Sequence, residues 1–112
     1  MTSDLEERAS ALYDIADVAP KLAAVTRDVV FGDVWERPEL PKRDRSLITV
    51  AALVALNRVE QLPIHLRRAL DNGLTRDEIA EAITHLAFYA GWPNAYTAIA
   101  LAKAVFAEKE VV

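Results

Sequence analysis

The sequence predicts an all-α fold of about six helices, and three observations support this prediction. Apolar residues recur at helical spacing along most of the 112 residues, proline or glycine separates the helical segments, and one segment opens with a capping box. A chain of this length is expected to form one domain, residues 1–112. Because 53% of its side chains are hydrophobic, we expect part of its apolar surface to lie against another subunit.

The first half of the chain is expected to contain three helices. Helical spacing of apolar residues indicates a first helix from Asp4 to about Asp17, and Pro20 favours the start of a second that runs to Gly32. Two prolines and a glycine make residues 32–41 a connecting loop. The run from Leu47 to Leu56 is apolar on all sides, which favours a central helix that is buried all round.

The second half is expected to contain three more helices, each with a local start or stop signal. Asn72-Gly73 is a C-terminal stop of the left-handed type, Thr75 and Glu78 form a capping box, and Gly91-Trp92-Pro93 breaks a helix. The expected helices run from Gln61–Pro63 to Asn72-Gly73, from Thr75 to about Ala90, and from Pro93 onward.

The composition argues against several classes of function. A chain without cysteine has no disulfide framework, no thiol redox chemistry and no thiolate metal site, and no other metal-binding motif is present. The formal net charge is −4 and no basic run is longer than Arg67-Arg68, so the sequence predicts no basic surface that would bind nucleic acid. No signal peptide is visible, and no apolar stretch approaches the ~20 residues of a membrane span. We therefore expect a cytoplasmic protein with no membrane partner.

The two histidines are the first candidates for chemistry. His65 lies in the first turns of its helix, where the positive N-terminus favours a neutral imidazole that can donate or accept a proton; a hydrogen-bonded structural role is the alternative. His85 belongs to a polar and aromatic stripe on the helix that starts at Thr75. The stripe consists of Glu78, Glu81, His85, Tyr89 and Trp92. It is either a subunit interface, with His85 paired to Glu81, or a pocket wall, and the two can coexist.

Five segments of the chain match the pattern of a known family in order and spacing. They are Phe31–Pro38, Arg43–Leu53, Gln61–Thr75, Glu78–Ile83 and Tyr89–Pro93. Over roughly residues 20–108 the chain thus resembles the carboxymuconolactone decarboxylase family. The resemblance implies an AhpD-like all-α fold, assembled as homotrimers or homohexamers with active sites near subunit boundaries. It also implies one of two activities: decarboxylation of 4-carboxymuconolactone in aromatic-acid catabolism, or an alkylhydroperoxidase activity.

The missing cysteines favour the first of these activities. The AhpD-like peroxidases carry Cys-x-x-Cys-x-x-x-His, and alignment on His65 places their cysteines at Arg58 and Gln61, neither of which can form a thiolate. The decarboxylases keep the histidine without the cysteines. They often carry glutamate where Gln61 stands and glutamine where His85 stands. A decarboxylase-like enzyme for another small oxo-acid or lactone, or a non-catalytic oligomeric binding protein, is therefore the alternative.

The resemblance implies roles for individual residues in a decarboxylation without a cofactor. The lactone carbonyl accepts the electrons when CO₂ leaves, so the protein supplies a hydrogen-bond donor, a proton source and cationic anchors. We expect His65 as donor or proton source, Glu60 as its supporting partner and His85 as a second acid–base group. Arg45 would anchor a carboxylate, unless it is a solvated helix-end charge or forms an ion pair with Asp44 or Glu78. The other substrate-binding candidates are Gln61, Trp35, Tyr89 and Trp92, of which Trp35 could instead fill the core or an interface.

Overall fold

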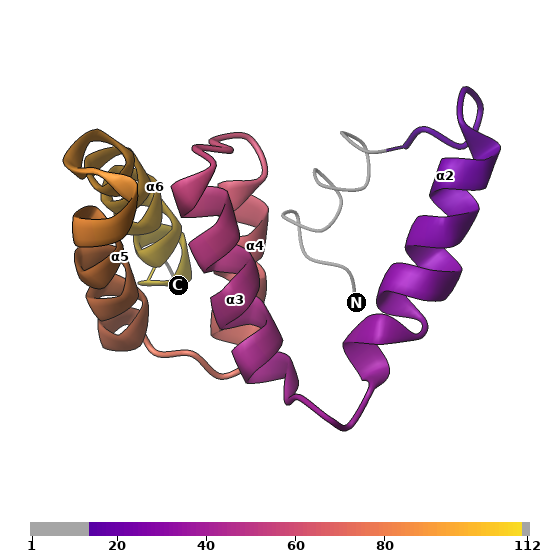
Figure 1. Ribbon diagram of the computed structural model, residues 1–112, viewed down its shortest axis with the longest axis horizontal. Coiled ribbons are helices and arrows are strands. Elements are labelled where there is room, and N and C mark those ends of the chain that lie inside the picture. The colour runs from indigo at the N-terminus through magenta and orange to yellow at the C-terminus, as the bar shows by residue number, and fades with distance from the viewer. Residues whose placement is uncertain (1–13, 111–112) are drawn as a thin grey trace. The chain divides into compact units, whose positions relative to one another are not determined.

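The structure, a computed structural model, describes residues 14–110, and within them every regular element is a helix. The all-α prediction is therefore confirmed. The elements are α2 (Pro20–Val25), the π-helix η1 (Thr26–Phe31), the 3₁₀ helix η2 (Val34–Glu36), α3 (Lys42–Ala55), α4 (Leu62–Asp71), α5 (Arg76–Ala90) and α6 (Trp92–Glu110) (Figure 1). The chain divides into two compact units, Met1–Pro41 and Lys42–Val112. The single domain expected for residues 1–112 stays a prediction.

The N-terminal unit contains the second predicted helix. It begins at Pro20, as expected for a residue whose φ suits the first helical turn, and continues from α2 into η1 up to Gly32. A Cβ atom at Gly32 would lie 2.8 Å from the carbonyl oxygen of Asp28, so glycine is required there. The first predicted helix, Asp4 to about Asp17, lies mostly outside the described residues. Residues 14–19 form no helix, so its predicted end at Asp17 is wrong.

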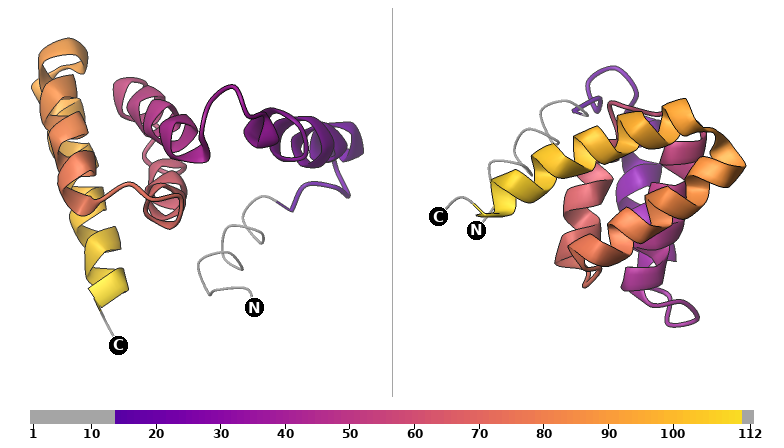
Figure 2. Two further views of the ribbon diagram at one scale, coloured as in Figure 1. Left: turned by 90° about the horizontal axis from the view of Figure 1, so that it is seen from below. Right: turned by 90° about the vertical axis from the view of Figure 1, so that its left-hand side faces the viewer.

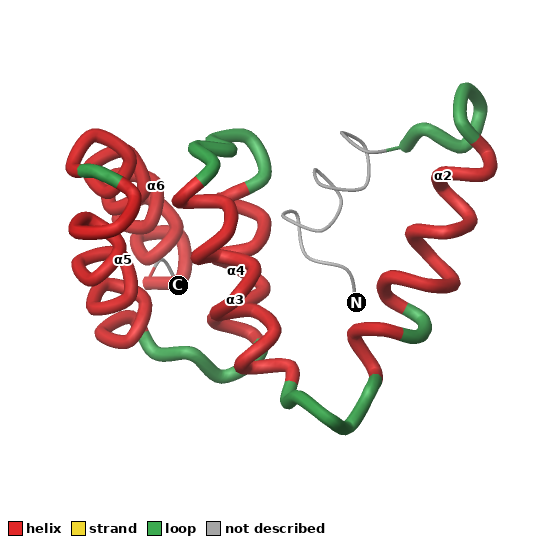
Figure 3. Tube along the Cα trace, in the orientation of Figure 1, coloured by secondary structure: helices red, strands yellow, loops and turns green. Residues whose placement is uncertain are grey.

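The C-terminal unit is a bundle of four helices joined by short connections (Figure 3). α3 packs against α4, α5 and α6, which confirms its central position, and α5 and α6 form a hairpin (Figure 2). The buried apolar residues of the described chain all lie in this unit. They are Val50, Val54, Leu62, Leu66, Ala69, Leu74, Ile79, Ile83, Ala87, Ala95, Ala98, Ala102, Val105 and Phe106.

The prediction that the central helix is buried all round is wrong for this chain. Only Ser46, Val50 and Val54 of α3 are buried, and their spacing of four residues places them on one face. Ile48 remains 58% exposed and Leu56, just beyond the helix, 64% exposed. The reason is that the other helices of the unit pack on one side of α3, so its opposite face has no neighbour within the bundle.

The predicted starts of α4, α5 and α6 and the predicted ends of α4 and α5 are confirmed within a residue or two, whereas α3 begins at Lys42 and not at the predicted Leu47. α4 ends before Gly73, whose φ of +106° is in the left-handed region, and Gly91, with φ +99°, separates α5 from α6. In the capping box, the Thr75 hydroxyl accepts a hydrogen bond from the Glu78 backbone N–H at 3.1 Å. The Glu78 carboxylate accepts one from the Thr75 N–H at 2.9 Å. Within residues 14–110, no helix combines the length and apolar character that a membrane crossing requires.

Candidate functional site

His65 lies in the first turn of α4, close behind the Pro63 that favours the start of this helix. Its side chain is half-buried, and its Nδ1 atom is shielded from solvent. Burial and, next, the positive charge of Arg68 lower the pKa of His65 to about 4. The neutral imidazole predicted at this position is therefore confirmed, with burial as its main cause.

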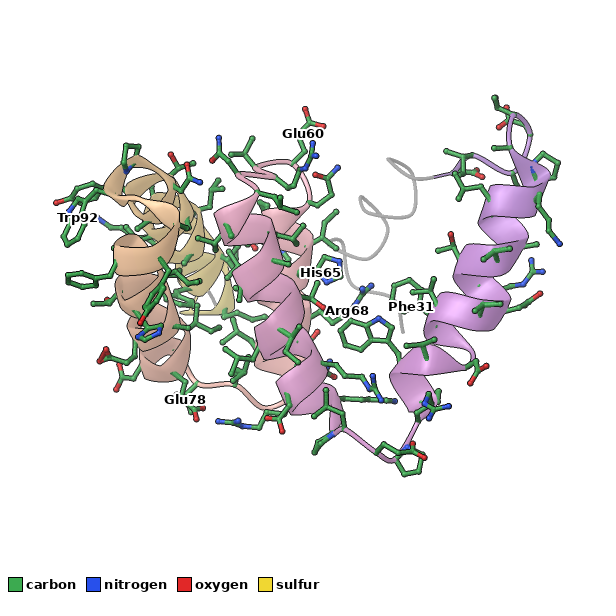
Figure 4. The ribbon with its side chains drawn as sticks, in the orientation of Figure 1. Phe31, Glu60, His65, Arg68, Glu78 and Trp92 are labelled. Carbon is green, nitrogen blue, oxygen red and sulfur yellow. The ribbon has the colours of Figure 1, made fainter. Side chains whose placement is uncertain are left out.

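Arg68 is a residue of this site that the sequence reasoning missed. It follows His65 by three residues, which places both on one face of α4, and it is also half-buried. Figure 4 shows both side chains projecting from α4 on the side away from α5 and α6. The i, i+3 spacing of a histidine and an arginine was the signal that could have found it.

The residues predicted to assist His65 lie on several different elements of the structure. Glu60 is exposed in the turn before α4, and its side chain points outward from the end of the bundle, away from His65 (Figure 4). Gln61 is the half-buried N-cap residue of α4. Arg45 is half-buried in the first turn of α3, and its carbonyl oxygen accepts a hydrogen bond from the Thr49 hydroxyl at 2.8 Å. Trp35 lies in the N-terminal unit, where its ring stacks on Phe31 with a centroid separation of 6.0 Å.

His85 lies in a different part of the molecule, at a cavity between α3 and α5 of about 500 Å³, which we call the α3–α5 pocket. The pocket is lined by Arg43, Leu47, Ala51, Leu74, Glu78, Glu81, Ala82, His85 and Leu86. His65 is not among these residues, so the pocket does not unite the two predicted acid–base groups. Arg43 forms an ion pair with Glu78 across the pocket. The contribution of α3 to this pocket, through Arg43, Leu47 and Ala51, was not predicted, since it depends on how α3 packs against α5.

The polar and aromatic stripe of α5 is divided between two surfaces. Glu78, Glu81 and His85 line the α3–α5 pocket, which agrees with the pocket-wall alternative for this part of the stripe. The predicted pairing of His85 with Glu81 is not found within the described residues, where the His85 ring stacks on Tyr89 at 4.9 Å. Tyr89 is 78% exposed and lines no described cavity.

Trp92 belongs to a second cavity, between α5 and α6. This groove has a volume of about 240 Å³ and is lined by Ile83, Thr84, Ala87, Trp92, Ala95, Tyr96 and Ile99. The Trp92 ring also meets Phe88 edge to face at 5.2 Å. Trp92 and His65 therefore lie on different parts of the C-terminal unit, as their labels in Figure 4 show. Within residues 14–110, no three histidine or carboxylate side chains gather as metal ligands.

Comparisons with known proteins identify relatives of this chain. It is 47% identical over 76 residues to the 4-carboxymuconolactone decarboxylase of Acinetobacter baylyi, covering 68% of this chain and 57% of that protein. It is 39% identical over 69 residues to the nitrosuccinic acid decarboxylase of Metarhizium robertsii, covering 62% of this chain and 48% of that protein. An uncharacterized 15.0 kDa protein of Paracoccus denitrificans is 30% identical over 95 residues, with 83% and 71% of the two chains covered.

The chain spans about half the length of the two decarboxylases that it matches. The chain also matches the model of one protein family, and this match is longer than those to the two decarboxylases, covering residues 20–104. That range contains α2, α3, α4 and α5 and most of α6. The chain therefore belongs to the carboxymuconolactone decarboxylase family.

Proposed function

We propose that this protein is a carboxy-lyase that decarboxylates a small lactone carboxylate of the 4-carboxymuconolactone type without a cofactor. The observation that carries the proposal is the neutral, half-buried His65 one helical turn from the cationic Arg68. The names of two relatives, 4-carboxymuconolactone decarboxylase and nitrosuccinic acid decarboxylase, support the reaction type. The family resemblance further suggests a cytoplasmic role in the catabolism of aromatic acids.

In the proposed reaction the carbon–carbon bond to the departing carboxylate breaks, and its electron pair moves through the ring double bond onto the lactone carbonyl oxygen. The neutral imidazole of His65 donates an N–H hydrogen bond to that oxygen as negative charge develops there. Arg68 and Arg45 attract the carboxylate that stays on the substrate. The resulting dienolate then takes up a proton on carbon, so the products are CO₂ and the decarboxylated lactone.

The lowered pKa of His65 favours the donor role over the proton-source role. With a pKa of about 4, only about one imidazole in a thousand is protonated at pH 7. A neutral imidazole is a good hydrogen-bond donor and a very weak acid, as in enzymes that polarise a carbonyl with a neutral histidine. The proton that reaches the dienolate carbon then comes from solvent water.

His85, Tyr89 and Trp92 are left out of this proposal, although the sequence suggested them for the site. His85 lines a pocket in which two glutamates face one arginine, and such a net negative charge disfavours a substrate that carries carboxylates. Trp92 lines the groove between α5 and α6. A second candidate function, decarboxylation of a different small acid, is supported by the name of the Metarhizium relative.

The test is turnover by the purified full chain, followed through the loss of lactone absorbance. We expect His65→Ala to lower kcat by about 10²–10³, as the loss of an oxyanion donor does, and His65→Gln, which keeps an N–H donor, to recover part of it. For His85→Gln we expect less than about a tenfold loss, because it replaces a group outside the proposed site. No turnover by the unmodified protein, or equal turnover with His65→Ala, would contradict the proposal.

We also propose that the protein is a homo-oligomer, a trimer or a hexamer. Large apolar side chains stay exposed on the single chain, which a partner subunit would cover. They include Ile48, Phe88, Tyr89, Trp92 and Tyr96. Sedimentation equilibrium measures the assembly directly, and a monomer at micromolar concentration would contradict this part of the proposal.

A further inference from the structure

The α3–α5 pocket has an apolar floor and a charged rim. Its apolar lining comes from both helices and the connection before α5, through Leu47, Ala51, Leu74, Ala82 and Leu86. The rim carries one cationic group and two carboxylates, together with an imidazole. A volume of about 500 Å³ falls in the ordinary range of small-molecule sites.

The charges on the rim are unequally satisfied. Arg43 pairs with Glu78 and also with Asp44, the latter at 3.4 Å. The second oxygen of Glu78 accepts a hydrogen bond from the backbone N–H of Thr75. Arg43 and Glu78 are thereby matched to each other, and little of the arginine's charge remains for a further anion.

Glu81 differs from Glu78 in this respect. Among residues 14–110, no hydrogen bond or ion pair reaches the Glu81 carboxylate. It lies one helical turn before His85, so the two side chains are neighbours on the wall formed by α5. Both side chains are exposed, and the His85 ring stacks on Tyr89, one turn further along α5. The formal charges of Arg43, Glu78 and Glu81, one cation and two carboxylates, leave one unmatched negative charge among these three groups.

We propose that the α3–α5 pocket binds a small molecule with an apolar, ring-sized body and a single ammonium group. The body would lie on Leu47, Ala51 and Leu86, and the ammonium would donate hydrogen bonds to the Glu81 carboxylate and to the His85 imidazole. Charge complementarity selects this ligand, because an anion would meet the unmatched Glu81, whereas one cation neutralises it. The site is separate from His65 and does not depend on the proposed decarboxylase activity.

Binding of benzylammonium to the full chain tests this site, with benzoate as the probe of equal size and opposite charge. We expect benzylammonium to shift the backbone amide NMR signals around the pocket on α3 and α5, and benzoate to shift none of them. Glu81→Gln should weaken benzylammonium binding about tenfold, equivalent to about 1.4 kcal/mol. Asp77→Asn removes the same charge from an exposed position on α5 outside the pocket and should bind as the unmodified chain does.

Three results would overturn the proposal. The first is equal binding of benzoate, and the second is an equal effect of Glu81→Gln and Asp77→Asn. The third is a concentration-dependent shift of the pocket signals without any probe, because a second copy of the chain would then occupy the pocket. His65→Ala should bind benzylammonium unchanged, so a failed decarboxylase assay and a failed binding assay are independent results.

Discussion

His65 carries a basic side chain in surroundings that favour its neutral form. Burial removes water that would solvate an imidazolium, and Arg68 adds a positive charge one turn away. Both effects act against protonation, and burial is the larger. The same arrangement that keeps the imidazole a hydrogen-bond donor also places a cation one helical turn from it.

Removing the arginine should raise the pKa of His65. In Arg68→Gln the cation is lost while burial remains, so we expect the pKa to rise from about 4 but to stay below the ordinary value of 6.5. NMR titration of the histidine ring signals measures the shift.

The neighbouring arginine provides a matched control for that experiment. Arg67 pairs with Glu108 at 2.9 Å, toward α6, so Arg67→Gln removes an equal charge from the other side of the same helix. We expect it to leave the His65 pKa nearly unchanged. An equal rise in both variants would mean that the net charge of the protein, and not the local contact, controls His65.

The stability of the protein should fall in acid through His65. The unfolded chain protonates this histidine near pH 6.5 and the folded chain only near pH 4, so stability is lost as the pH drops from about 6.5 to 4 and then levels off. Allowing for the solvent that reaches a half-buried ring, we expect about 1–2 kcal/mol. Urea unfolding at pH 7 and pH 4.5 measures the difference, and His65→Gln should lose less than the unmodified chain. An equal loss in both would rule His65 out as the source.

At the scale of elements, a residue that caps the start of α5 also lines the α3–α5 pocket. Glu78 is at once the third residue of the capped helix turn, the partner of Thr75 and the partner of Arg43 on α3. The cap thus sets the helix start and also positions a carboxylate against the neighbouring helix. Across α3, Ser46 is buried and accepts a hydrogen bond from the Asn72 side-chain amide at 2.9 Å, which joins α3 to the end of α4.

Loss of the cap should destabilise the start of α5. Thr75→Ala removes the hydroxyl that accepts from the Glu78 N–H, and we expect a loss of about 1 kcal/mol in the free energy of unfolding. Thr75→Ser keeps the acceptor and should lose much less. Urea unfolding followed by circular dichroism compares the two variants. If serine and alanine destabilise equally, the methyl group of Thr75 and not its hydroxyl is what matters.

At the scale of the whole molecule, the buried apolar residues of the described chain are concentrated in the C-terminal unit. Leu66 of α4 is fully buried and belongs to the core that α3, α4, α5 and α6 share. In the N-terminal unit no residue between 14 and 41 is buried. The stability of the described structure therefore depends mainly on residues 42–110.

Truncation of the core should be far more costly than truncation of the surface. For Leu66→Ala we expect a loss of about 2–5 kcal/mol, since the side chain is completely enclosed. Leu56→Ala removes the same atoms from a side chain that is 64% exposed, and its effect should stay within about 0.5 kcal/mol. Equilibrium unfolding in urea measures both. A large loss in Leu56→Ala would show that this exposed leucine is covered by a partner in solution.

The sequence by itself determined the all-α class, most helix boundaries and the family. Pro20, Gly73 and the Thr75–Glu78 capping box each act on the backbone within a few residues, so their effect is present in the local sequence. The neutral state of His65 was predicted as well, but from its position near a helix N-terminus, whereas burial and Arg68 lower its pKa in the structure.

Tertiary structure alone decided which face of α3 is buried and where the polar residues of α5 meet other helices. The pair of Arg43 and Glu78 joins residues 35 positions apart, and no local pattern encodes that distance. The even distribution of apolar residues around α3 likewise gave no indication of which side its neighbours would cover. Burial and charge pairing between helices depend on packing of distant segments, whereas helix starts and stops depend on bonds within one or two turns.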